Sequence, residues 1–128
     1  ALDVIEHLGK GEGLALLDVM ERIARKQVII LTPNGFLPKG ELEDGNPLQV
    51  HHSGWHASDF ERRGYAVVGR RGLKVLRGEH AEIRWQPRLF WGLVAYLSQP
   101  FVRTRPELAF HLLAHKSSME KNRNKRSK

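Results

Sequence analysis

The hydrophobic positions in the first quarter of the chain recur at helical spacing. Apolar side chains return every three or four residues, at Leu16, Leu17, Met20, Ile23 and Ala24. Charged residues fill the other faces, so the pattern predicts an amphipathic helix over 12–26. A continuous, largely β-branched run follows at 27–32, which is typical of a strand buried on both faces of a parallel sheet. Pro33-Asn34-Gly35 ends it.

Helix and strand patterns continue to alternate through the rest of the chain. Residues 36–55 are rich in Gly, Pro and charge, and predict a long loop. Ser58 and Glu61 fit a capping box, in which each side chain satisfies a free backbone amide, and Gly64 suits the left-handed end of that short helix. Pro87 suits the first turn of a further helix. The remaining predictions are extended segments at 65–69, 73–76 and 108–114, and an apolar helix over 88–98.

The order of these elements predicts an α/β fold. The N-terminal residues Leu2-Asp3-Val4 form an apolar stub that leads directly into charged residues, as if a strand were entered near its end. Two strands joined through a helix in one sheet run parallel, with a right-handed connection. We therefore expect the stub to pair in parallel with 28–32, within one domain that covers residues 1–115.

Composition narrows the classes of protein. An apolar fraction of 41% supports a core, and cysteine is absent. No run approaches the ~18 apolar residues of a membrane span, and the features together are compatible with the cytoplasm. The net charge is +7, but residues 116–128 hold six Lys and Arg against one Glu. Most of the surplus therefore lies in a basic tail that we expect to be flexible, and it does not favour nucleic acid as the main partner.

Three segments, taken in order, resemble the second half of class I S-adenosylmethionine-dependent methyltransferases. Asp3-Val4-Ile5-Glu6-His7-Leu8 is similar to the acidic-x-x-Glu-His-hydrophobic segment after the family's fourth strand, and Val28–Asn34 resembles its fifth strand with a Thr-Pro-Asn ending. The third segment resembles the family's distal histidine, helix, Gly-aromatic pair and sixth strand, here at His51 or His52, Ser58-Asp59-Phe60, Gly64-Tyr65 and the strand that follows. Residues 108–115 correspond to the seventh strand by position.

The resemblance implies the C-terminal half of a Rossmann-like methyltransferase sheet, with strands four to seven and their crossover helices. The family's glycine-rich acidic turn and acidic ribose ligand, which hold most of the cofactor, are not found in the 128 residues. We therefore expect a sheet that is completed by missing residues, or by homo-oligomerisation through an exposed strand edge, and weak cofactor binding by this chain alone. The function implied for the complete protein is methyl transfer from S-adenosylmethionine to a small-molecule acceptor.

The resemblance also implies roles for individual residues. Glu6 and His7 are the candidate catalytic residues, because a histidine can remove a proton from an acceptor near neutral pH and a carboxylate can orient it. The segment implied to lie against the cofactor consists of Leu2, Asp3 and Val4. The candidate substrate-binding residues are Asn34, His51, His52 and Trp55.

Alternative interpretations stay open. His7 and Glu6 also suit the start of a helix, and Trp55 also suits a core. Asp3, Glu6 and His7 with a distal histidine resemble the divalent-metal pattern of small-RNA 2′-O-methyltransferases; Asp3 stands where a longer Glu is usual, so Mg²⁺ is the less favoured cofactor and no metal ligand is assigned. The alternative functions are a non-catalytic oligomerising fragment, and a module that binds RNA or an anionic surface through the tail and the apolar 89–101 segment.

Overall fold

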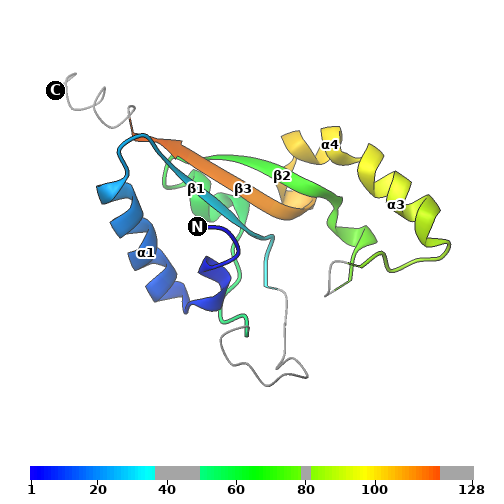
Figure 1. Ribbon diagram of the computed structural model, residues 1–128, viewed down its shortest axis with the longest axis horizontal. Coiled ribbons are helices and arrows are strands. Elements are labelled where there is room, and N and C mark those ends of the chain that lie inside the picture. The colour runs from blue at the N-terminus through cyan, green and yellow to red at the C-terminus, as the bar shows by residue number, and fades with distance from the viewer. Residues whose placement is uncertain (37–49, 79–81, 119–128) are drawn as a thin grey trace.

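The computed structural model describes residues 1–36, 50–78 and 82–118, which form a mixed α/β structure (Figure 1). Four helices and three strands make up most of it within these ranges. The helices are α1 (Lys10–Ile23), α2 (Ala57–Glu61), α3 (Arg88–Leu97) and α4 (Gln99–Thr104). The strands are β1 (Gln27–Pro33), β2 (Ala66–Leu73) and β3 (Ala109–Ser117). Short 3₁₀ helices, η1 (Ile5–His7), η3 (Lys74–Leu76) and η4 (Pro106–Leu108), connect them.

The last strand lies in the middle of the sheet. The strand order is β1-β3-β2, and β3 is antiparallel to both neighbours, with Leu31 opposite Leu113 on one side and Val68 opposite Leu113 on the other. β1 and β2 therefore point the same way without touching. The predicted strands at 27–32, 65–69 and 108–114 are confirmed, but the sheet is not parallel throughout, because β3 pairs with 27–32 in the opposite direction.

The N-terminal stub pairs in parallel with β1, as the sequence predicts. Leu2 forms a parallel bridge with Leu31. The Asp3 N–H donates to the Leu31 carbonyl oxygen, and the Leu31 N–H donates to the Ala1 carbonyl oxygen, both at 3.0 Å. The stub thus covers the outer edge of β1 over its central residues.

One face of the sheet carries the hydrophobic core. Side chains from α1, α2 and the strands meet there with no exposed surface, at Leu17, Ile30, Trp55, Phe60 and Leu112. Burial of each large apolar side chain contributes about 2 kcal/mol, before the entropy of ordering it. The other face is less covered, because Ile29 is 37% exposed and His115 is exposed. The prediction that β1 is buried on both faces is therefore wrong within the described residues.

The sequence predicted the boundaries of α2 and the segment after β2 only in part. Helix α2 starts at Ala57 rather than after Ser58, because the backbone N–H of His56 donates to Asp59 Oδ2 at 2.9 Å and makes His56 the cap. Gly64 has φ +79°, which confirms the left-handed end of that helix. Of the extended segment predicted at 73–76, only Leu73 belongs to β2; the rest is η3, which follows an irregularity in the strand where Gly72 has φ +70°.

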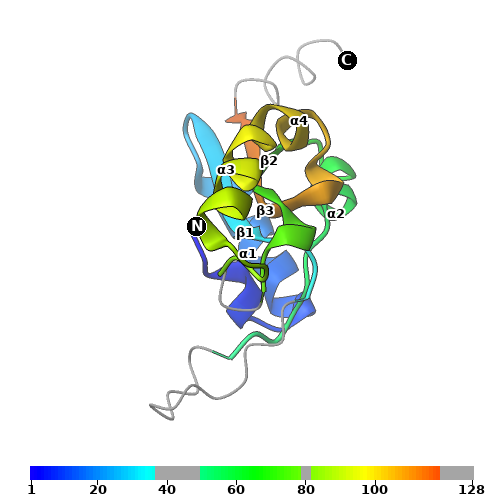
Figure 2. The same cartoon turned by 90° about the vertical axis from the view of Figure 1, so that its right-hand side faces the viewer.

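Helices α3 and α4 are fixed against the outer edge of β2, at the end of the molecule away from α1 (Figures 1 and 2). The Gln99 amide makes two bonds to this edge: Nε2 donates to the Gly69 carbonyl oxygen at 3.0 Å, and Oε1 accepts the Gly72 N–H at 3.1 Å. Ser98 Oγ accepts the Leu73 N–H at 3.2 Å. Side chains thus satisfy part of an edge that would otherwise invite another strand.

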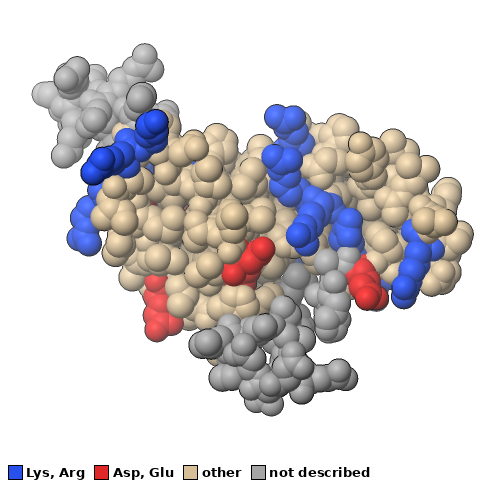
Figure 3. Space-filling model, viewed as in Figure 1, with Lys and Arg blue, Asp and Glu red and all other residues tan. Residues whose placement is uncertain are grey.

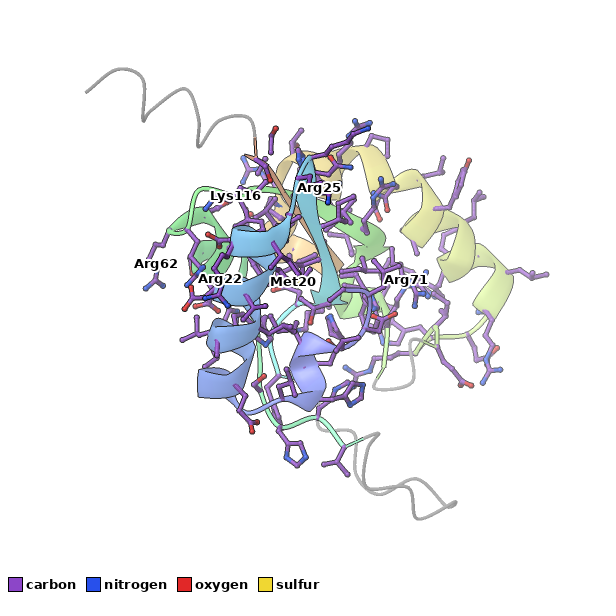
Figure 4. All side chains as sticks on the ribbon, turned by 60° about the vertical axis from the view of Figure 1, so that its left-hand side comes forward. Met20, Arg22, Arg25, Arg62, Arg71 and Lys116 are labelled. Carbon is purple, nitrogen blue, oxygen red and sulfur yellow. The ribbon has the colours of Figure 1, made fainter. Side chains whose placement is uncertain are left out.

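The C-terminal end of β3 lies beyond the boundary predicted at residue 115. Lys116 belongs to the strand, and its Nζ donates to Glu21 Oε2 at 3.0 Å and to the Arg63 carbonyl oxygen at 2.6 Å. Figure 4 shows Lys116 beside α1 and α2, with Arg71 at the other end of the strands. Lys116 therefore links three elements instead of belonging to the tail. The rest of the predicted tail, 119–128, and most of the predicted loop, 37–49, lie outside the described residues.

We predict that Gly69→Ala destabilises the protein by about 3 kcal/mol. A Cβ at this position would overlap the Val102 carbonyl oxygen of α4, which is backbone and cannot rotate away. Gly11→Ala is the matched control, because nothing lies within 4 Å of a Cβ there and alanine favours a helix. Urea unfolding of both variants measures the difference. Equal stability of the two would show that α4 is not held against β2 as described.

Candidate functional site

The stub and η1 form the first part of the candidate site. Asp3 has φ +49°, a left-handed conformation that is uncommon outside glycine and that turns the chain from the stub into η1. Ile5 is fully buried, and its carbonyl oxygen accepts hydrogen bonds from Ser53 Oγ and Trp55 Nε1, each at 3.3 Å. These contacts fix the position of the next two residues, Glu6 and His7.

Glu6 is a buried carboxyl group at the junction of three segments. It is only 3% exposed, and its Oε2 accepts a hydrogen bond from Thr32 Oγ1 at 3.1 Å, at the end of β1. Its backbone carbonyl oxygen accepts the N–H groups of His52 and Ser53, at 2.9 and 3.1 Å. Burial raises the pKa of Glu6, and the bond from Thr32 opposes part of this increase. β1 therefore bonds to the carboxyl group of Glu6, and the segment at 50–53 bonds to its backbone.

His7 and His51 lie beside Glu6. The rings of the two histidines meet edge to face, with centroids 4.9 Å apart. His7 Nδ1 is 3.1 Å from the Val50 carbonyl oxygen, which can only accept, so Nδ1 carries the proton and Nε2 of the neutral ring keeps its lone pair. Glu6, His7 and His51 each offer one ligand atom, and these atoms lie within 4.8 Å of one another. We call these three residues the Glu-His-His cluster.

The structure distinguishes between the two distal histidines. His52 follows His51 directly but is exposed, and its hydrogen bond to Glu6 comes from its backbone. The side chain of His51 is half-buried and belongs to the cluster. The sequence left open which of the two histidines lies near the site. The structure places the side chain of His51 beside Glu6 and His7.

Two of the predicted substrate-binding residues make structural contacts. The Asn34 amide nitrogen is placed against the carbonyl oxygens of Pro106, Glu107 and Ala109, at 3.1, 2.9 and 2.8 Å. Asn34 is 4% exposed, so this amide ties the end of β1 to the start of β3. Trp55 is fully buried, stacks on Phe60 and leaves no surface for a substrate. Packing and backbone carbonyls thus hold both side chains in place, and substrate binding by Asn34 and Trp55 stays a prediction.

The residues expected to lie against a cofactor are on the surface. Leu2 is 62% exposed and Val4 is 43% exposed, on either side of the exposed Asp3. Two apolar side chains and one carboxylate therefore stand together at the carboxyl end of the stub. This is the edge of an α/β sheet where ligands commonly bind.

His111 is a site residue that the sequence analysis missed. It lies on β3, is 5% exposed, and its Nε2 is 3.8 Å from Asp3 Oδ1. Burial lowers the pKa of His111 to about 4, with a further contribution from the Arg71 charge. The ring is therefore neutral near pH 7, beside the carboxylate of Asp3. Only the place of β3 next to β1 could have revealed the pair, because the two residues are far apart in sequence.

Comparison of the chain with known proteins gives no relative: no protein-family model matches it, and no curated protein or solved structure does either.

We predict that His111 makes the stability of the protein depend on pH between about 6.5 and about 4. The pKa of His111 is lower in the folded protein than in the unfolded chain, so the unfolded chain binds the proton first as pH falls. The contribution of His111 to the free energy of unfolding should be present in full above pH 6.5. It should fall by up to about 3 kcal/mol by pH 4. His111→Phe should lack this component.

Urea unfolding across this pH range measures the effect. The same substitution at His115, which is exposed on the same strand, controls for the loss of any one imidazole. Identical pH profiles for the unchanged protein and His111→Phe would contradict the assignment.

Proposed function

We propose that these residues form the C-terminal half of a class I methyltransferase domain, and that the complete protein transfers a methyl group from S-adenosylmethionine to a small-molecule acceptor. One observation carries the proposal. The acidic-x-x-Glu-His segment at Asp3–His7 follows a strand end paired in parallel with β1, and the Thr32 hydroxyl at the end of β1 donates to Glu6. The two motifs that resemble the family's fourth and fifth strand ends are thus joined at one place.

The arrangement of the strands supports the same proposal. The stub, β1, β3 and β2, which resemble the family's fourth, fifth, seventh and sixth strands, lie side by side in one sheet in this order. In the described residues the second face of the sheet is only partly covered, which fits a domain in which further helices pack on that face.

The surface at the stub fits part of a cofactor site. The exposed Leu2 and Val4 offer apolar surface, and Asp3 offers a carboxylate and a left-handed backbone turn. S-adenosylmethionine, when bound, supplies a methyl group activated by a sulfonium charge. A nearby carboxylate stabilises such a charge, and exposed apolar side chains suit the flat face of a nucleobase. Other contacts would come from the glycine-rich turn and ribose ligand, which are not in this sequence.

Glu6 and His7 suit the handling of a proton from the acceptor. The lone pair on His7 Nε2 is available because Nδ1 bonds to the Val50 carbonyl oxygen. The raised pKa of Glu6 brings its carboxyl group closer to the range in which a base works at neutral pH. An acceptor hydroxyl or amine held beside this pair loses its proton to His7 as the nucleophile attacks. The Val50 carbonyl oxygen fixes the position of the ring, and the nearby Glu6 carboxyl group stabilises the charge that the ring gains.

We predict that Glu6→Gln and His7→Asn each lower kcat by about 10²–10⁴. The protein to use is the product of the longest reading frame that contains these residues. Glu6→Gln keeps an acceptor for the Thr32 hydroxyl and removes a buried acid, so its melting temperature should not fall.

His52→Asn is the control, because that side chain is exposed next to the site. Turnover and melting temperature are measured for each variant. Near-normal turnover with a large drop in melting temperature would assign Glu6 and His7 a purely structural role.

The Glu-His-His cluster favours a metal-assisted version of the same reaction as a second candidate. Glu6 is buried, and its carboxyl group accepts a hydrogen bond from a neutral hydroxyl, so a cation would compensate its charge. Two imidazoles and one carboxylate suit Mn²⁺, Fe²⁺, Co²⁺ or Zn²⁺ better than Mg²⁺, which prefers oxygen ligands. Such an ion, when bound, polarises an acceptor hydroxyl and helps its proton to leave.

We predict that the cluster binds Co²⁺ and that His51→Ala weakens binding by at least about tenfold, since one of three ligands is lost. His52→Ala is the matched control, because His52 is adjacent in sequence but exposed. Calorimetry and the visible absorption of Co²⁺ give two independent measurements. Equal affinity in both variants, or none in the unchanged protein, would eliminate the metal.

A further inference from the structure

Helix α3 has apolar side chains on its outer side as well as on its inner side. Its inner side packs toward β2, where Ala95 is 2% exposed. Its outer side would be polar in an ordinary surface helix, but it carries apolar side chains three or four residues apart, which share one face. These are Leu89 (92% exposed), Leu93 (55%), Tyr96 (76%) and Leu97 (65%). A helix that is apolar all round is normally covered on every side.

The apolar surface continues beyond α3. Phe101 of α4 is 50% exposed, Phe90 is 54% exposed, and Trp85 just before the helix is 45% exposed. Trp85 and Phe90 each meet the Trp91 ring edge to face, with centroids 4.7 and 5.2 Å away. We call this surface the α3–α4 face. Contiguous apolar surface of this extent marks an interaction site.

The α3–α4 face is held in place by the fold. Gly72 of β2 lies so close to α3 that a Cβ would overlap the Ala95 carbonyl oxygen. Ser98 and Gln99, between the helices, bond to the backbone of β2. The apolar side chains are therefore presented outward by a fixed pair of helices. They also lie on the side of β2, whereas further strands of the sheet would add beside the stub, at the opposite edge.

Positive charge predominates in the part of the chain that carries the α3–α4 face. In the described part of residues 66–109 the acidic side chains are Glu82 and Glu107. The basic side chains of the same stretch are Arg70, Arg71, Lys74, Arg77, Arg84, Arg88, Arg103 and Arg105. Figure 3 shows an uncharged surface at the α3–α4 end, with Lys and Arg and also an acidic side chain along its border. Two copies joined through this face would bring two sets of cations together, so the charge fits an anionic occupant.

We infer that the α3–α4 face binds the surface of an anionic lipid membrane. Leucine and phenylalanine side chains enter the boundary between headgroups and acyl chains, while arginines at the rim pair with lipid phosphates. Trp85 and Tyr96 have the amphipathic rings that favour this boundary. No helix in the described residues is long and apolar enough to cross a membrane, so the contact lies at the surface. This inference is independent of the proposed methyl transfer.

The test measures binding of the 128-residue chain to phosphatidylcholine vesicles with and without phosphatidylglycerol. We expect binding that requires the anionic lipid. L89S/L97S should weaken it by at least about tenfold, because two exposed leucines leave the membrane. V19S/I23S is the matched control, since these α1 residues are 41% and 67% exposed at the other end of the molecule. R84Q/R105Q should weaken binding about fivefold for each charge removed.

Three results would overturn the inference. The first is no vesicle binding by the unchanged chain. The second is equal binding by L89S/L97S, which would assign the contact to the basic C-terminal residues. The third is a concentration-dependent dimer, seen by light scattering, that L89S/L97S abolishes while vesicles are not bound. Circular dichroism checks the fold of each variant. Substitutions at such exposed positions should not change it.

Discussion

The position of β3 is the constraint on which the rest of the structure depends. This strand comes last among the described elements, yet it lies between β1 and β2 and pairs with both along most of their lengths. Its Leu112 and Ala114 enter the core, and Lys116 holds α1 through Glu21. β1 and β2, from the start and the middle of the chain, are therefore joined in one sheet only when β3 pairs with both. Such long-range pairing folds slowly.

The pairing of the strands in this sheet determines the geometry of the candidate site. β1 is fixed by β3 on one side and pairs with the stub on the other, so the end of the stub and the Thr32 hydroxyl reach the same buried carboxyl group, Glu6. An isolated carboxyl group that is 3% exposed costs stability unless something compensates it. The buried carboxyl group of Glu6 lies beside two histidines, His7 and His51. Ionisable groups that are buried together in this way are typical of a chemical site.

The sequence predicted the elements better than their environments. Continuous apolar runs correctly located β1 and β3, and the parallel contact of Leu2 followed from the order of elements. Burial of both faces was wrong, because it depends on a second layer that no local pattern records. For Trp55 the sequence left a core role and a substrate role open, because its partners, Ile5 and Phe60, are far from it in sequence or identifiable only in the folded chain. His51 and His52 were indistinguishable in sequence for the same reason.

Photo-crosslinking tests the central claim, that the end of the stub lies against S-adenosylmethionine, most directly. The product of the longest reading frame that contains these residues is irradiated with the labelled cofactor, and the labelled peptide is identified by mass spectrometry. The account predicts label within residues 1–8, around the exposed Leu2, Asp3 and Val4, and loss of that label when unlabelled cofactor is added in excess. Label confined to other parts of the protein, or no specific label, would contradict it.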